Sequence, residues 1–307
     1  MNIIKWTSGK IDTPGVYDIP IEIYHSDICS GPSISSSGLR TIDTESPEHY
    51  WDQSYLNPVG EPQKETEALI FGRAAHALLL GESNFKKKFV IRPEELAGRA
   101  WQGNRTECKE WVKDQTLPIL TNDDLDTLRG MAARLARHPL IQAGLMNGEI
   151  ERSMFWKDKE TQIWLKVRPD VMPVNLDVLG DYKTTADASR YAVRRDIYER
   201  GYHLQLALAG MGMEELMGRR PGPDDYVLIF QEKKRPYSIN IKPLDAEAIA
   251  FGRMQLRRAI RVFADCWEKQ DWYGYDDDEK TASLPGYAIT ELKGRLARSE
   301  LRKEDAE

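Results

Sequence analysis

Hydrophobic and polar residues change their period several times along the chain, and each change predicts an element. Residues 1–60 are rich in Ser, Pro, Gly and Asp, which favours loops around short helices. In "KETEALIFGRAAHALLLGE" apolar residues lie on all sides of the helical turn, so we expect a helix buried within the domain. A helical pair is expected in "TNDDLDTLRGMAARLARHPLIQAGL", with Asn122 or Asp123 as the N-cap and Pro139 marking the break.

The period then shortens to that of β-strands. Three short runs, "ERSMFWKD", "QIWLKVRPDVMP" and "LDVLGDYKTT", are apolar or alternating, which predicts an antiparallel meander. In the middle run Trp164, Lys166, Arg168 and Asp170 would share one face. After a turn at "RPGPDD", the runs "YVLIFQEK" and "YSINIKPL" predict two further strands.

Helical patterns surround the second group of strands. They occur in "ASRYAVRRDIYERGYHLQLALAGMGMEELMG" and in "AEAIAFGRMQLRRAIRVFADCWEKQ", the latter with Asp245 as N-cap. This order predicts an α/β (α+β) fold with a mixed central sheet, flanking helices and an N-terminal helical elaboration. We expect a loop-rich N-terminal elaboration at 1–65, a core at 66–272, and a charged tail or frayed helix at 273–307.

Composition narrows the class of protein. With 307 residues, 41% hydrophobic and 30% charged, the chain has the composition of a soluble globular protein, and no apolar run is long enough to span a bilayer. The start "MNIIKWTSGK" lacks the pattern of a signal peptide, so we expect a cytoplasmic location. The net charge of −6 means that any contact with DNA needs a local basic surface or help from metal ions.

Cysteine usage excludes several kinds of site. Cys29, Cys108 and Cys266 are too few and too far apart for a disulfide framework, a zinc knuckle or a four-thiolate iron–sulfur cluster. We therefore expect three structural free thiols and no iron–sulfur cluster.

The stretch "LGDYKTT" places Asp181 and Lys183 on the same face of a strand. We expect Asp170 to end one strand, and a tight turn to the next strand would bring its carboxylate close to Asp181. Two ionised carboxylates at such a distance repel each other unless a cation lies between them. Oxygen ligands suit Mg²⁺ or Mn²⁺, which lower the pKa of a bound water and neutralise charge on a phosphoryl group. Lys183 would orient that water or stabilise developing negative charge.

These residues also carry a resemblance. "RPD", a ten-residue gap and "DYK" resemble the Asp…(Asp/Glu)-x-Lys core of the PD-(D/E)XK nuclease superfamily. "FGRAAHALLL" and "GYHLQLALAG" resemble the Gly-x-x-x-His helix and the Tyr-x-x-Gln motif of its RecB-like and exonuclease VIII (RecE-type) branch. "ERSMFWKD" resembles the strand that opens the core in RecE-type proteins. The match runs over roughly residues 70 to 265 and implies a restriction-endonuclease-like core.

The resemblance implies a role for each matching residue. His76, Asp170 and Asp181 would be metal ligands, together with the backbone carbonyl of Tyr182, and Lys183 would be the catalytic lysine. The implied ion is Mg²⁺, with Mn²⁺ as a substitute.

Further residues receive auxiliary roles from the same resemblance. Glu151 would help to position a second metal or its water, while Tyr202 and Gln205 would hold the scissile strand or the active-site loop. One departure is Ala209, where RecB-like nucleases often have a tyrosine, and it weakens the link to RecB itself. The residues that would bind DNA are Tyr202, Gln205, Arg168, Arg194 and Arg195.

Basic clusters elsewhere in the chain could also contact phosphates. They are Arg194, Arg195 and Arg200; Lys233, Lys234 and Arg235; and, at helical spacing, Arg253, Arg257, Arg258 and Arg261. Each cluster by itself is more often a solvated face.

The implied function is a Mg²⁺-dependent 5′→3′ exonuclease on linear double-stranded DNA that leaves 3′ overhangs for annealing. Such enzymes occur in phages and prophages, act in the bacterial host cytoplasm, form homo-oligomeric rings and work with a single-strand annealing protein. Two alternatives remain: another nuclease of the superfamily, such as a single-strand or structure-specific endonuclease, and a non-catalytic DNA-end-binding scaffold.

Each of these residues, taken alone, could also have a purely structural role. His76 alone would more often be a core histidine, Glu151 a solvated charge at a strand end, and Tyr202 and Gln205 ordinary helix residues. The occurrence of all these signals in the expected order favours the nuclease.

Overall fold

The computed structural model describes residues 2–61, 65–79, 85–173, 178–275 and 283–304. The chain forms two compact units, Met1–Gly274 and Tyr275–Glu307, which are described separately below.

A five-stranded mixed sheet forms the centre of the first unit. Its strand order is β14-β13-β12-β11-β8. The strands are β8 (Gly148–Ile150), β11 (Val171–Pro173), β12 (Leu179–Thr185), β13 (Tyr226–Glu232) and β14 (Ile239–Pro243). β12 and β13 run parallel over their whole length, and the other neighbours are antiparallel. The predicted mixed sheet is therefore present, and the stretch that holds Asp181 and Lys183 is its middle strand.

A second sheet of five strands has the order β1-β2-β9-β10-β3. Its strands are β1 (Ile3–Lys5), β2 (Gly15–Asp18), β3 (Ser33–Ser35), β9 (Ser153–Lys157) and β10 (Trp164–Val167). The sequence analysis did not predict β1, β2 and β3, because three or four residues are too few to display an alternating pattern. β2 pairs with β9 and β3 pairs with β10, while β1 pairs with β2, so the N-terminal segment completes this sheet.

The expected meander is correct in part. β9 and β10 pair antiparallel, as do β11 and β12. β10 and β11, however, belong to different sheets, so the predicted middle strand is wrong as a single element. Pro169 explains the break, because proline has no N–H to donate to a strand ladder. Asp170 consequently lies in the connection between the two sheets.

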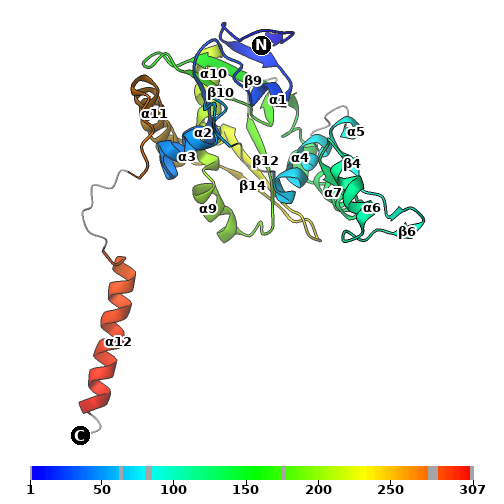
Figure 1. The fold of residues 1–307 in the computed structure, drawn as a ribbon. Coiled ribbons are helices and arrows are strands. Elements are labelled where there is room, and N and C mark those ends of the chain that lie inside the picture. The colour runs from blue at the N-terminus through cyan, green and yellow to red at the C-terminus, as the bar shows by residue number, and fades with distance from the viewer. Residues whose placement is uncertain (1, 62–64, 80–84, 174–177, 276–282, 305–307) are drawn as a thin grey trace. The chain divides into compact units, whose positions relative to one another are not determined.

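Helices cover both faces of the central sheet (Figure 1). On one side α10 (Tyr202–Met217) is buried against the sheet, and α11 (Ala246–Lys269) and α2 (Ser36–Thr44) pack on it. Gly252 allows α11 to approach α10, since a Cβ there would come within 3.1 Å of Ala207. On the other side α4 (Glu67–Leu79) and α7 (Asn122–Leu135) form a second core with β12 and β13.

Two details of the helices differ from expectation. α4 is buried along one face only, since Leu69 and Leu78 are exposed, so the predicted all-round burial is wrong. The N-cap of α7 is Thr121 rather than Asn122 or Asp123. The Thr121 hydroxyl accepts the Asp124 N–H, and the Asp124 carboxylate accepts the Thr121 N–H, which completes a capping box.

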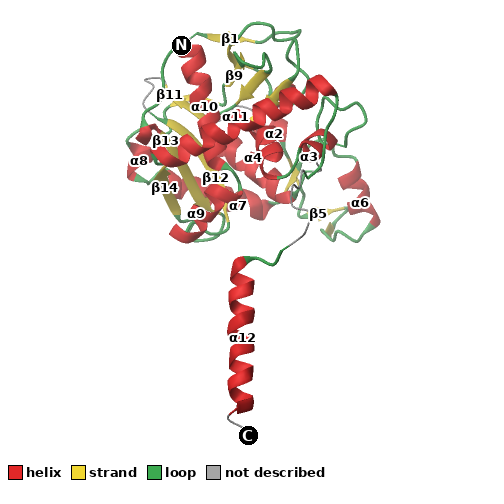
Figure 2. Ribbon diagram, turned by 90° about the vertical axis from the view of Figure 1, so that its left-hand side faces the viewer, coloured by secondary structure: helices red, strands yellow, loops and turns green. Residues whose placement is uncertain are grey.

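Other features agree with the sequence. Asp245 caps α11 by accepting the Ala248 N–H at 2.7 Å, and Pro139 begins a new helix after α7. The remaining helices are α1 (Ile21–Tyr24), α3 (Pro47–Asp52), α5 (Phe85–Lys88), α6 (Thr106–Lys113), α8 (Pro139–Gln142), α9 (Arg190–Glu199) and a 3₁₀ turn at Pro223–Asp225 (Figure 2). Short strand pairs join β4 (Val90–Ile91) to β7 (Ile119–Leu120) and β5 (Glu95–Leu96) to β6 (Arg99–Ala100).

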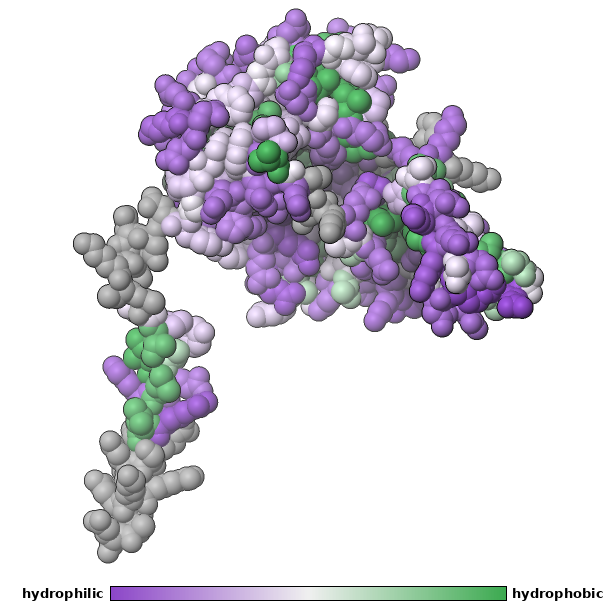
Figure 3. Space-filling view, in the orientation of Figure 1, coloured by the Kyte–Doolittle hydropathy of each residue, from purple (hydrophilic) through white to green (hydrophobic). Residues whose placement is uncertain are grey.

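The second unit contains one long helix, α12 (Gly286–Glu304). Ile289, Leu292 and Leu296 are exposed on it, and Figure 3 shows hydrophobic side chains gathered along this helix. Across the described residues of both units, no helix has the length and apolar character needed to cross a membrane.

Candidate active site

The acid and base on β12 lie together, as their spacing predicts. Lys183 Nζ is 2.6 Å from Asp181 Oδ2, and the Asp181 side chain is fully buried. Gln205 on α10 joins both residues: its Nε2 donates to Asp181 Oδ1 at 2.9 Å, and its Oε1 accepts from Lys183 Nζ at 3.1 Å. The glutamine therefore fixes the relative orientation of the carboxylate and the ammonium group.

The start of α10 brings an aromatic ring to the same lysine. Lys183 Nζ lies 5.0 Å from the centre of the Tyr202 ring, a cation–π distance. Gly201, in the left-handed region with φ +62°, makes the turn that places Tyr202 there. The structure thus brings Tyr202 and Gln205 into the site, where both contact Lys183.

A second pair of residues meets at the entrance to β11. His76 Nδ1 on α4 lies 3.3 Å from Asp170 Oδ1. Asp170 Oδ2 accepts the backbone N–H of Tyr182 at 2.6 Å, so this carboxylate is attached directly to β12. The His76 ring also makes an edge-on contact with the Tyr182 ring, with centroids 5.6 Å apart. His76, Asp170 and β12 are therefore contiguous, as the sequence analysis predicts.

Glu151 is held beside Asp170 by an arginine. Its backbone has a positive φ of 50°, and its N–H donates to the Asp170 carbonyl at 3.0 Å. Such backbone conformations in a non-glycine residue are often found at functional sites. Arg168 Nη2 lies 2.9 Å from Glu151 Oε2, and its Nη1 donates to the Ile19 carbonyl at 2.8 Å. Arg168 thus braces Glu151 against the N-terminal segment; its role in binding DNA stays a prediction.

The two buried aspartates differ in acidity. Burial raises the pKa of both, but for Asp170 the neighbouring His76 and Lys183 outweigh it and lower the pKa to about 2. For Asp181, burial is the largest influence, and repulsion from Asp170 adds to it, so the pKa rises to about 7 despite Lys183. Burial and repulsion therefore favour the protonated form of Asp181, whereas His76 and Lys183 hold Asp170 in its ionised form.

The two basic partners respond in the opposite sense to burial. Burial alone would lower the pKa of His76 and of Lys183. The Asp170 carboxylate instead raises the pKa of His76, and the Asp181 and Asp170 carboxylates raise that of Lys183. In the absence of another cation, these two side chains supply the positive charge that the carboxylates need.

The donors at this site are of the kind that divalent cations bind. Within the described ranges, no three His, Cys, Asp or Glu side chains already form a complete ligand set, because His76 faces Asp170 and Lys183 faces Asp181. Asp181 Oδ2 is buried, and its neighbour is the Lys183 ammonium group at 2.6 Å. A buried carboxylate with a raised pKa, beside a second carboxylate and an imidazole, fits a Mg²⁺ or Mn²⁺ ion chemically.

The basic clusters have different surroundings. Arg194 and Arg195 are exposed on α9, the helix that follows β12. The arginines of α11 instead pair with carboxylates from other elements: Arg253 with Glu214, Arg257 with Asp158, Arg258 with Asp43 and Arg261 with Glu160. The α11 stripe thus attaches the helix to the body of the first unit.

Two buried polar residues near the site were missed. Gln231 on β13 accepts the Tyr182 hydroxyl at 2.7 Å and donates to the Met131 carbonyl at 2.9 Å, which links β12 to α7. Lys166 is buried on β10 and donates to the Tyr24 and Ser26 carbonyls, so it anchors the N-terminal segment. Neither residue stands in a motif, and the only signal was a polar residue within an apolar run.

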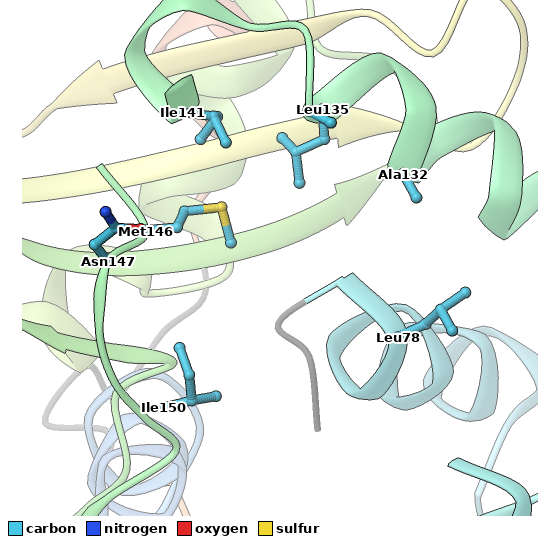
Figure 4. Close-up of a pocket in the computed structure, with 8 residues that line it drawn as sticks. Leu78, Ala132, Leu135, Ile141, Met146, Asn147 and Ile150 are labelled. Atoms are coloured by element: carbon cyan, nitrogen blue, oxygen red, sulfur yellow. The ribbon is translucent and has the colours of Figure 1, made fainter. Parts of the chain in front are cut away.

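An apolar cavity of about 370 Å³ lies between α4, α7, α8 and β8 (Figure 4). Its lining includes Leu78, Leu135, Met146 and Ile150. Leu78 follows His76 by two residues and Ile150 precedes Glu151, so the cavity borders the elements that hold the site. Its lining is largely aliphatic, so the groups that could take part in chemistry lie outside the cavity, on β12, α10, α4 and the β10–β11 connection.

Comparisons with known proteins agree with this geometry. A family model described as a PDDEXK-like domain of unknown function (DUF3799) matches residues 35–278, and no curated protein matches. Among solved structures, the chain is similar to the crystal structure of a candidate exonuclease from Eubacterium rectale. The TM-score is 0.58 at 15% identity, over 87% of this chain and 96% of that chain, which shows a shared fold.

The family and the fold confirm the predicted PD-(D/E)XK resemblance and the predicted α/β class, and they support a nuclease. The chain belongs to the family of PDDEXK-like domains of unknown function (DUF3799).

Proposed function

We propose that the protein is a metal-dependent exonuclease that digests linear double-stranded DNA from 5′ to 3′ and leaves 3′ overhangs. One observation carries the proposal. His76 and Asp170 are paired beside β12, and Asp181 and Lys183 on β12 form a connected set with Gln205 on α10, in which Asp181 is fully buried. This is the residue order and chemistry expected of the exonuclease VIII (RecE-type) branch.

Asp170, Asp181 and His76, with the Tyr182 carbonyl, would hold Mg²⁺, or Mn²⁺ in its place. When bound, the ion would neutralise charge on the phosphoryl group and would lower the pKa of a water molecule bound to it. Gln205 keeps Lys183 beside Asp181, so that the ammonium group stabilises negative charge as it develops on the phosphate. The Tyr202 ring, which contacts the Lys183 ammonium group, would further limit the movement of that side chain. Arg168 keeps Glu151 next to Asp170, where a second ion or its water would be positioned.

The proposal extends to partners. A homo-oligomeric ring would enclose the DNA and supply processivity, and a single-strand annealing protein would take up the 3′ overhang. Arg194 and Arg195 would contact phosphates from α9, where both are exposed to solvent.

We expect a linear duplex labelled at its 5′ ends to release the label early in the presence of Mg²⁺, while the same duplex labelled at its 3′ ends keeps it until late. A covalently closed circle should remain intact, because an exonuclease needs an end. Gel electrophoresis of both substrates over time, with EDTA as the control, measures this.

The alternatives give different results in the same assay. Rapid cutting of the closed circle would show an endonuclease and overturn the proposed exonuclease. Binding of the linear duplex without Mg²⁺-dependent digestion would show a DNA-end-binding scaffold, whose carboxylates have no catalytic role.

A further inference from the structure

We infer that the exposed face of α9 is a binding platform for single-stranded DNA, formed by Tyr191, Arg194, Arg195 and Tyr198. We call it the α9 platform. The inference rests on the proposed nuclease function, because it names where the unpaired strand next to the site would lie.

The two tyrosines project from one face of the helix into solvent. Tyr191 is 79% exposed and Tyr198 is 75% exposed, whereas Ala192, Val193 and Asp196 are buried on the opposite face. A separation of seven residues is two helical turns, so the two side chains point the same way about 10 Å apart. Exposure of two large aromatic rings on one short helix needs an explanation that core packing does not provide.

Positive charge lies between and beside the rings. Residues 190–200 contain four arginines and two carboxylates, in a chain whose net charge is −6. Arg195 lies within 3.4 Å of Asp196 or Glu199 oxygens, but among the described residues no carboxylate is in ion-pair range of Arg190 or Arg194. This differs from α11, where each arginine of the stripe is paired with a carboxylate. Of the two arginines of the platform, Arg194 therefore has its charge available for phosphates, while Arg195 shares its charge with Asp196 and Glu199.

Both ends of α9 are fixed by hydrogen bonds to other elements of the first unit: β13, β14 and α2. Before the helix, the Ala188 N–H donates to Glu232 Oε1 at 2.9 Å, and the Ala188 carbonyl accepts from Asn240 Nδ2 at 2.8 Å. After it, the Arg200 carbonyl accepts from Arg40 Nη1 at 2.9 Å. The next residues are Gly201 and Tyr202, whose ring lies over Lys183.

The position of α9 in the chain favours a strand that has just left the site, or is about to enter it. α9 follows the β12 strand of Asp181 and Lys183, and α10 with Gln205 follows it in turn (Figure 1). A DNA strand that contacts Lys183 on β12 and Tyr202 on α10 would therefore contact the two elements that come directly before and after α9 in the sequence.

The chemistry of the platform favours an unpaired strand over a duplex or a protein. Tyrosine rings stack on exposed base faces, which a duplex offers only at its ends, and arginines between the rings neutralise the intervening phosphates. A spacing of about 10 Å between the rings suits a few successive nucleotides of an extended strand. A protein partner would need acidic side chains at this position to pair with the arginine, whereas every DNA strand offers phosphates there.

The test uses the full chain in EDTA, so that binding is measured without cleavage, and follows the anisotropy of a fluorescein-labelled 20-mer of dT. The Tyr191→Ala/Tyr198→Ala double variant is expected to bind about tenfold more weakly or worse, and Tyr191→Phe/Tyr198→Phe to stay within about twofold of wild type, because stacking needs only the ring. Tyr287→Ala removes a tyrosine that is 77% exposed on α12 and should leave binding unchanged.

Salt dependence and a duplex arm complete the test. Arg194→Ala should weaken dT binding and reduce its dependence on salt concentration, while affinity for a blunt 20-base-pair duplex should change less than affinity for dT in the tyrosine double variant. Unchanged dT binding in the double alanine variant would overturn the inference. So would an equal loss for duplex and dT, or a change of oligomeric state by light scattering with dT binding intact, which would show a protein interface. Because cleavage is not the readout, failure of the nuclease proposal would be seen separately.

Discussion

Asp181→Asn is expected to abolish digestion of linear duplex DNA, with a loss on the order of a thousandfold or more. The substitution keeps the shape of the side chain and an oxygen that accepts the hydrogen bond from Gln205 Nε2. It removes the negative charge that would bind the cation and that faces Lys183 at 2.6 Å. Single-turnover digestion of end-labelled linear DNA at saturating Mg²⁺ measures the loss.

The matched control is Asp158→Asn. Asp158 is also buried and is also paired with a cation, Arg257, at 2.7 Å, but it lies in the turn after β9. We expect this variant to lose thermal stability and keep its digestion rate at temperatures well below unfolding. Circular dichroism should show that Asp181→Asn is folded, so that its loss of digestion is a loss of chemistry. Near wild-type digestion by this variant would refute the proposed mechanism.

The second large effect is expected for Lys183→Met. Methionine keeps much of the length of the side chain and its contact with Tyr202, but removes the ammonium group that would stabilise charge on the phosphate. A loss of about a hundredfold to a thousandfold in the single-turnover rate is expected, as when one charge-stabilising group is removed from an enzyme. The raised pKa of Lys183 means that this group is charged throughout the neutral range, so the loss should persist from pH 6 to pH 9.

Lys157→Met provides a comparison for that variant. Lys157 also stands on a strand with its ammonium group over an aromatic ring, 5.3 Å from the centre of Trp164. It lies on β9, so its substitution should change digestion little. If Lys157→Met and Lys183→Met slowed digestion equally, the effect would come from lost charge in general, and the specific role of Lys183 would be refuted.

The sequence predicted the central part of the fold because its signals are local. The runs that became β12, β13 and β14 are apolar or alternating, and α11 starts at a capping aspartate. The connection from β10 to β11 was harder to predict, since the alternating pattern continues across Pro169, where the chain changes from one sheet to the other. Strands β2 and β3 depend on partners more than a hundred residues away, which no local pattern reveals, and β1 depends in turn on β2.

In the candidate site, too, the sequence predicted what is local and not the contacts between distant residues. The spacing of Asp181 and Lys183 determines a shared strand face, and the structure places them in contact. The bridge from Gln205 and the brace between Arg168 and Glu151 join residues 17 to 24 positions apart across different elements, so the sequence could suggest roles but not contacts. The arginine stripe of α11 was ambiguous because its carboxylate partners are up to 215 residues distant.

The most direct test is the position of a bound ion in crystals grown with Mn²⁺, found from its anomalous scattering. The account predicts a peak at about 2.0–2.5 Å from carboxylate oxygens of both Asp170 and Asp181 and from a ring nitrogen of His76. A fully occupied Mn²⁺ elsewhere, with Asp170 still on His76 and Asp181 still on Lys183, would contradict it.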